Sequence, residues 1–336
     1  METWDILRNV WFILVGVLLA GYSVLDGFDL GVGVLLPFLA RNEDEKTSLV
    51  RSIGPVWDGN EVWLLTGGGA LFAAFPHAYA TVFSGFYLAL MLVLFSLILR
   101  AVSLEFRAQD GARKKLWEGA FVIGSFFPAL LFGVALGNVV VGVPIDAQME
   151  YAGNFFTLLR PLPLVFGLLG LAAFLLHGSM WAALKTSGAL QERARRTART
   201  MAFSTGFLYF LSFVAVWIYL PGALKRIAAW IFAALVWLSL GLLLSALKKG
   251  KDGRAFLFSS CVFLSLWGNV GAIHYPNLVR AADPALSLTI TNASSSALTL
   301  KVMLIIALVG MPLVIGYTIY AYRVFKGKAG LDDTGY

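Results

Sequence analysis

Long apolar segments separated by short polar connections recur along the whole chain. A helix that crosses a hydrocarbon core about 30 Å thick needs roughly 20 residues, and nine of the segments are long enough. They cover residues 9–37, 53–75, 79–104, 116–140, 161–184, 200–220, 227–247, 255–276 and 298–323. The pattern predicts an all-α integral membrane protein with nine transmembrane helices and no stretch for a soluble domain.

The composition agrees with this pattern. Of the 336 residues, 59% are hydrophobic and 13% are charged, and the mean hydropathy is +0.79. Soluble domains are about 45–50% apolar and about 25% charged, so that class is excluded. The first segment is too long for a signal-peptide core and is preceded by Asp5 rather than by a basic leader. We therefore expect residues 1–336 to form a single polytopic membrane domain.

The net charge of +7 does not indicate nucleic-acid binding, because the basic residues follow the loops. Nineteen of the 26 Lys and Arg residues lie in connections that follow odd-numbered segments, and five lie on the opposite side. Cytoplasmic loops carry the excess of Lys and Arg in membrane proteins. The distribution predicts an N-terminus outside the cytoplasm and a cytoplasmic C-terminus.

Four acids lie inside the first two predicted helices: Asp26 and Asp29 in DGFD, and Asp58 and Glu61 in WDGNEVW. At about 1.5 Å rise per residue they lie roughly 17, 12, 10 and 15 Å from the cytoplasmic ends of these helices. Arg100, roughly 7–10 Å from the end of the third, joins them. Each acid pair has i,i+3 spacing, so we expect each pair to share one helix face and to point inward.

An ionised acid at the centre of a bilayer costs about 2.5–3.5 kcal/mol even on the lenient insertion scale, so these acids need a reason. One interpretation is a proton pathway, in which desolvated carboxyl groups linked by water gain and lose protons and Arg100 keeps one or two ionised. The other is structural: the acids pair with Arg100 and fix the helix register. The two weigh equally for Asp26 and Glu61, whereas proton transfer is favoured for Asp58, which stands between two tryptophans.

Other candidate residues carry weaker signals. Trp63 lies near mid-membrane in a glycine-rich helix, where an indole can line a cavity, although plain packing is the favoured interpretation. The glycines at 67–69 and the pair Gly27 and Gly31 predict close helix packing. The histidines at 77, 177 and 274 are scattered along the chain, so they predict hydrogen-bonded or interfacial roles and no metal or haem site.

Several long blocks make the chain resemble subunit II of the cytochrome bd quinol oxidases. They are GYSVLDGFDLGVG (21–33), SIGPVWDGNEVWLLTGGGALFAAFP (52–76), FSGFYLALMLVLFSLILRAVSLEFR (83–107), HGSMWAALKTSGALQERAR (177–195) and DPALSLTITNASSSALTLKVM (283–303). The resemblance covers nearly the whole chain, and the WDGNEVW and DGFDLGVG blocks are highly specific.

The resemblance implies two four-helix bundles plus one peripheral helix, paired with a related subunit I in a bacterial or archaeal cytoplasmic membrane. That partner holds two b-type haems and one haem d and oxidises quinol, and the complex reduces O₂ to water. The subunit resembled here ligates no haem and is inactive alone. The family also leaves room for small single-helix accessory subunits and for a structural quinone or lipid.

Two residue roles come with the resemblance. The acid of the WDGN motif, which matches Asp58, belongs to the family's proton route from the cytoplasm. The tryptophan of the EVW segment, which matches Trp63, lies near a described oxygen route. We expect Asp58, Asp29, Asp26, Glu61 and Arg100 to form the proton pathway.

Two other classes of function stay open from the residues alone. A proton-coupled secondary transporter would use the same carboxyl groups and predicts broken helices in two inverted halves. The glycines at 67–69 supply one possible break, and the second half of the sequence offers no matching one. A purely structural assembly subunit predicts that neutralising the acids lowers haem content rather than turnover.

Overall fold

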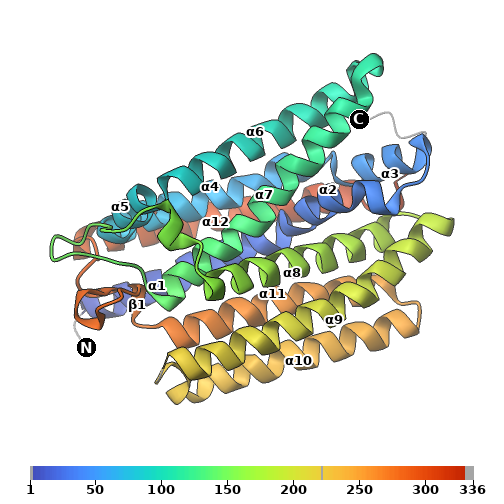
Figure 1. Ribbon diagram of the computed structural model, residues 1–336. Helices are drawn as coiled ribbons and strands as arrows, with labels where there is room; N and C mark the ends of the chain where they lie inside the picture. The colour runs from blue at the N-terminus through green and yellow to red at the C-terminus, as the bar shows by residue number, and fades with distance from the viewer. Residues whose placement is uncertain (1–2, 221, 330–336) are drawn as a thin grey trace.

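The computed structural model describes residues 3–220 and 222–329, which form long helices running side by side (Figure 1). Within these ranges the helices make nine membrane-length passes, as the hydropathy pattern predicts. The passes are α1 (Thr3–Leu25) with α2 (Gly27–Leu39), α4 (Trp57–Ala74), α5 (Pro76–Gly85) with α6 (Tyr87–Gln109), α7 (Lys114–Val141), α8 (Pro161–Lys185), α9 (Gly188–Tyr219), α10 (Ile227–Lys248), α11 (Asp252–His274) and α12 (Ala297–Val324).

Eight of these passes contain a helix that is long enough and apolar enough to cross a membrane, judged by length and composition. The ninth, α4, has 18 residues but begins with the polar run Asp58, Asn60 and Glu61. The pass that is not among these eight is therefore the one that carries the WDGNEVW motif.

The remaining elements lie at the two ends of the passes. The amphipathic helix α3 (Glu43–Ile53) connects α2 to α4 at one end, which we call the α3 end. At the other, the β1 end, strands β1 (Asn277–Val279) and β2 (Leu288–Thr289) pair antiparallel. The 3₁₀ turns are η1 (Gly111–Arg113), η2 (Phe155–Leu158), η3 (Ala223–Lys225) and η4 (Pro284–Leu286). Figure 1 shows α3 and β1 at opposite ends of the molecule.

The passes group into two sets of four and one outlier. The first set contains α1–α2, α4, α6 and α7, and the second contains α8, α9, α10 and α11. They join where α2 and α7 pack against α8. The outlier, α12, packs on α1 and α4, and Leu300 is its one buried residue. This is the architecture of two bundles and a peripheral helix.

Glycines set the closest crossing between the bundles. A Cβ added to Gly31 of α2 would lie 2.9 Å from the Gly178 Cα of α8, and closer still to the carbonyl oxygen of Phe174. A Cβ on Gly27 would lie 2.8 Å from the Phe174 ring. The predicted packing role of Gly27 and Gly31 is confirmed. Among residues 67–69, only Gly67 faces a neighbouring helix, where it packs on Leu19.

Candidate functional site

The candidate site begins at a break in the first pass. Asp26 separates α1 from α2, and its side chain is fully buried, as is that of Arg100 on α6. Arg100 donates two hydrogen bonds to this carboxylate, from Nη1 to Oδ2 at 3.0 Å and from Nη2 to Oδ1 at 2.6 Å. Such a forked pair is strong and fixes both side chains in orientation.

Glu61 of α4 is the second carboxylate on the same guanidinium. Its Oε2 accepts from Arg100 Nη2 at 3.2 Å, and its side chain is 22% exposed. The Nε of Arg100 is buried without a hydrogen-bond partner in the described chain. Gly124 of α7 makes room for α6 at this level, because a Cβ there would lie 2.7 Å from the Arg100 backbone nitrogen. Arg100 thus holds acids from two passes together, as the sequence predicts.

Asp29 belongs to a neighbouring buried chain of hydrogen bonds. The Asn60 Nδ2 donates to Asp29 Oδ2 at 2.7 Å, and the Tyr322 hydroxyl donates to Asn60 Oδ1 at 2.9 Å. The contacts join α2, α4 and the peripheral α12. The other carboxylate oxygen of Asp29, Oδ1, is buried without a partner among the described residues. Asp29 and Asp26 also interact electrostatically, so the two acids of the first pass form one cluster.

Asp58 lies elsewhere, and the expectation that it points inward is wrong. It is exposed on the surface of this chain, whereas Asn60 faces the interior. Three residues turn a helix by about 300°, so Asp58 and Glu61 differ by about 60° around α4. That offset leaves Glu61 on the edge of the buried face and Asp58 outside it. Asp58 still acts electrostatically on Glu61.

Asp58 lies on an otherwise apolar face. Val62, Leu65 and Phe72 follow it along α4, and all three are exposed in this chain. An exposed apolar helix face of this kind meets either lipid or another membrane protein. An acid on a face that meets lipid is costly.

Trp63 packs within the chain. A Cβ on Gly21 of α1 would lie 2.5 Å from the Trp63 Cε3 atom, so the indole lies directly against the α1 backbone. The position agrees with the packing interpretation, and the oxygen role implied by the resemblance stays a prediction.

His177 of α8 uses both ring nitrogens inside the protein. Its Nε2 lies 2.9 Å from the Val24 carbonyl oxygen and its Nδ1 lies 2.7 Å from the Ser259 hydroxyl. His274 contacts the Leu278 carbonyl at 3.0 Å. Within the described ranges, no three His, Cys, Asp or Glu residues converge as metal ligands. These contacts give both histidines hydrogen-bonding roles.

An ion-pair network lies at the α3 end, between α3 and the ends of α6 and α7. Glu118 of α7 contacts Lys46 at 2.8 Å and Arg107 at 3.0 Å, and both cations also reach Glu43 of α3. The hydrogen bond from Lys46 lowers the pKa of Glu43. The hydrogen bond to Glu118 raises the pKa of Lys46. This network anchors α3 across the ends of α6 and α7.

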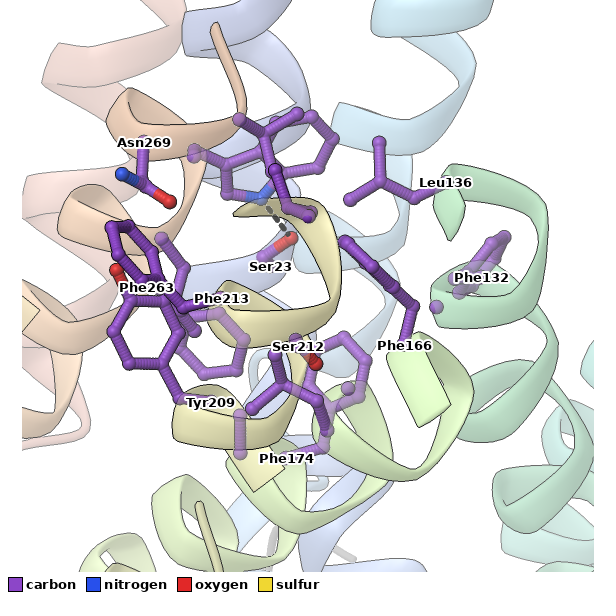
Figure 2. A pocket seen from close by; sticks show the side chains of 18 of the residues that line it. Ser23, Phe132, Leu136, Phe166, Phe174, Tyr209, Ser212, Phe213, Phe263 and Asn269 are labelled. Carbon is purple, nitrogen blue, oxygen red and sulfur yellow. Dashed lines mark hydrogen bonds between the residues drawn. The ribbon is translucent and has the colours of Figure 1, made fainter. Parts of the chain in front are cut away.

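An apolar cavity lies between the two bundles, lined from α1, α7, α8, α9 and α11 (Figure 2). Its wall is mostly aromatic and aliphatic. The Trp267 Nε1 donates to the Ser23 hydroxyl at 2.9 Å on this wall. The Tyr209 hydroxyl is buried and has no partner among the described residues.

Comparisons with known proteins agree with this architecture. The family model of cytochrome bd terminal oxidase subunit II matches residues 7–325. The chain belongs to this family. It is 36% identical to cytochrome bd-I ubiquinol oxidase subunit 2 of Escherichia coli K12, over 99% of this chain and 98% of the relative. It is 38% identical to cytochrome bd ubiquinol oxidase subunit 2 of Bacillus subtilis, over 96% of both chains.

The fold comparison agrees. A solved structure of bd oxidase from Geobacillus thermodenitrificans superposes with a TM-score of 0.79 and 18% identity, over 95% of this chain and 98% of that chain. As a bd oxidase subunit II, the chain is part of a membrane oxidoreductase complex with a partner subunit I and haems in the complex. Family membership decides against the stand-alone transporter.

Proposed function

We propose that this chain is the haem-free subunit of a quinol:O₂ oxidoreductase and carries protons to the oxygen-reducing centre of its partner. The observation that carries the proposal is the position of Asp58. This acid is exposed on an apolar face of α4, one helical turn from Glu61, which contacts the buried Arg100–Asp26 pair. An acid in that position needs a protein partner rather than lipid.

The α3 end faces the cytoplasm in this proposal, and the membrane is the cytoplasmic membrane. The excess of Lys and Arg in the connections at the α3 end supports that orientation. Asp58 stands near the start of α4, which begins at the α3 end. Protons therefore reach Asp58 from the cytoplasmic side, and the extracytoplasmic side carries the β1 end.

Each acid has a distinct task. Asp58 takes a proton at its carboxylate and passes it on at the boundary with subunit I. Glu61, half-buried and in contact with Arg100, is the next carboxyl group inward. Arg100 donates hydrogen bonds to both Glu61 and Asp26 and so holds their carboxyl groups together. Asp29, with one oxygen unpartnered, belongs to this buried cluster of carboxyl groups, which buffers protons behind Asp58.

Subunit I covers the Asp58 face and supplies the redox chemistry. The two b-type haems and haem d of that partner take electrons from quinol and reduce O₂. The exposed row Val62, Leu65 and Phe72 is suited to pack against an apolar partner helix. This chain contributes rigidity and proton delivery, and it is inactive alone. Trp63, packed at mid-membrane on α1, borders the oxygen route.

Two further components fit the chain. The apolar cavity offers an apolar wall and, in the Tyr209 hydroxyl, a buried polar group that a structural quinone or lipid can contact. The peripheral α12, in which Leu300 is the one buried residue, offers a surface on which single-helix accessory subunits pack.

The test is Asp58→Asn in the assembled oxidase. Asparagine keeps the shape of the side chain but cannot carry the proton, so we expect steady-state turnover to fall roughly tenfold or more with haem content unchanged. The matched control is Asp44→Asn, which neutralises an exposed acid of α3 at the same end and leaves turnover intact. Normal turnover of Asp58→Asn with full haem content would exclude Asp58 from the path. A loss of haem content instead of turnover would favour a purely structural role.

A further inference from the structure

A basic hollow lies at the β1 end, at the start of α10. Lys225, Arg226 and Arg280 line it together with Tyr275 and Ile273, and it holds about 540 Å³ of open space. These three are most of the five basic residues found in the connections at this end. The other two are engaged elsewhere: Arg8 pairs with Asp5, and Arg160 bonds Asn138 and the Gly142 carbonyl.

No described carboxylate balances the charge of the hollow. Lys225, Arg226 and Arg280 form no ion pair with an acid in the described ranges. Arg280 is half-buried, and its Nε is buried without a hydrogen-bond partner among these residues. Three cations without an acid, one of them with an unused buried donor, form a site for an anion.

The protein holds the two guanidinium groups in place. The Nη2 of Arg280 donates to the Ile273 carbonyl at 3.2 Å. The guanidinium of Arg226 lies over the Tyr275 ring, 4.5 Å from its centroid, and the Tyr275 hydroxyl donates to Asn9 at 2.7 Å. Arginine side chains fixed in this way lose less entropy when they bind a ligand.

The backbone adds a favourable field. Arg226 immediately precedes α10, a helix of 22 residues whose N-terminus has no side-chain cap. The N-terminal end of a helix carries a partial positive charge, which favours phosphate and other anions.

Ile273 connects the hollow to an apolar space. It lines both the basic hollow and the apolar cavity between the bundles. The residues around Ile273 are also apolar, among them Val216, Leu220 and Ala229. A ligand with an anionic head and hydrocarbon chains matches both surfaces at once, whereas a neutral quinone leaves the three cations unbalanced.

We propose that this hollow binds the phosphate group of a membrane phospholipid, with the headgroup between Lys225, Arg226 and Arg280 and the chains along the apolar wall at Ile273. Basic pockets between transmembrane helices bind lipid headgroups by this chemistry. The site goes beyond proton delivery and is independent of it. It holds a lipid at the edge of the second bundle, far along the chain from the acids of the first.

The experiment uses the assembled oxidase and the triple variant K225Q/R226Q/R280Q. Native mass spectrometry and ³¹P NMR count the phospholipids that remain after detergent washing. We expect the triple variant to retain one phospholipid fewer per complex than the wild type. The matched control K248Q/K249Q/K251Q removes three basic charges at the end of α10 and in the turn to α11, at the α3 end, and should retain the wild-type number. Equal retention in the wild type and K225Q/R226Q/R280Q would overturn the proposal.

Two further experiments distinguish a lipid phosphate from free phosphate and control for misfolding of the triple variant. Delipidated complex is titrated with phosphatidylglycerol in mixed micelles or with inorganic phosphate, and the thermal midpoint is followed. We expect the lipid to raise the thermal midpoint of the wild-type complex and not that of the triple variant. Stabilisation by inorganic phosphate alone would overturn the lipid source.

The variant K225R/R226K/R280K keeps the three charges and should retain the lipid. If the triple variant lacks haem, the single variant K225Q, at an exposed side chain, should still lower lipid retention, and unchanged retention there would count against the site.

Discussion

Arg100 is the residue on which the buried charges of the first bundle depend. It is fully buried, forms a forked pair with Asp26 and shares Nη2 with Glu61. Taking such charges out of water costs several kcal/mol per ion, and only paired geometry compensates for it. Neutralising either Arg100 or Asp26 would therefore leave the other charge buried without its partner and lower the stability of the protein.

We predict that Asp26→Asn destabilises the chain by about 3–5 kcal/mol, because it leaves the Arg100 charge buried with only the weaker contact to Glu61. The readout is the thermal midpoint and haem content of the purified complex. Asp5→Asn is the control, because it removes an exposed partner of Arg8 and should cost at most about 1 kcal/mol. Equal effects of the two substitutions would contradict this account of Arg100.

The sequence predicts which acids lie inside the membrane-spanning segments, but it predicts less well which helix face each acid occupies. Depth counting brings Asp26 and Glu61 to one level and places the long side chain of Arg100 somewhat nearer the cytoplasm, and the structure joins all three. Depth counting cannot give the rotation of α4, which is set by packing on α1 and α12. The i,i+3 spacing therefore predicts an inward-pointing Asp58, whereas the structure places this side chain on the exposed face. The hydrogen bond from Tyr322 to Asn60 spans 262 residues and has no local signal, although Asn60 inside an apolar pass was a visible anomaly.

At the scale of elements, the crossing of α2 and α8 decides how the two bundles meet. Gly31→Ala would push a methyl group into the α8 backbone near Phe174 and Gly178. Backbone cannot rotate away as a side chain does, so we predict a loss of about 1–3 kcal/mol or more. The thermal midpoint of the complex measures it. Gly16→Ala on α1, where a Cβ meets nothing within 4 Å, should leave the midpoint unchanged; a similar shift in both variants would show that the crossing is not special.

The attachment of α3 is predicted to depend on pH. The pKa of Glu43 is lowered by the hydrogen bond from Lys46, so this stabilising contribution is present above the unfolded value of 4.5 and is lost as pH falls through the lower folded value. The hydrogen-exchange protection of residues 43–53, corrected for the pH dependence of the intrinsic exchange rate, should therefore fall on acidification below pH 4.5. Glu43→Gln should flatten this dependence, and an unchanged acid profile in that variant would assign the effect to another group.

The number and positions of the passes follow from hydropathy, but their interruptions do not. The first predicted segment is broken at Asp26 and the third at Phe86. Asp26 is held at its break by the pair with Arg100, a tertiary contact that local helix preference does not encode. The amphipathic α3 lies between apolar segments and was expected only as a polar connection. A search for long apolar runs does not detect a short helix of this kind.

At the scale of the whole molecule, the Asp58 face is the surface that subunit I should cover. Leu65, on that face of α4, is 72% exposed in this chain, and Phe203, on α9 of the second bundle, is 69% exposed. We predict that a photo-crosslinking residue at Leu65 captures subunit I in the assembled complex and that one at Phe203 does not. Gel shift and mass spectrometry identify the product. Capture from Phe203 alone would place the partner on the second bundle and remove the support for Asp58 as a boundary residue.

The central claim, proton delivery through Asp58, is tested most directly by proton uptake in a single turnover. Fully reduced oxidase in detergent reacts with O₂ in a weakly buffered solution with a pH indicator, and the wild type is compared with Asp58→Asn and Asp44→Asn. The account predicts that proton uptake slows roughly tenfold or more in Asp58→Asn and is unchanged in Asp44→Asn, with haem content equal in all three. Proton uptake at the wild-type rate in Asp58→Asn would contradict it.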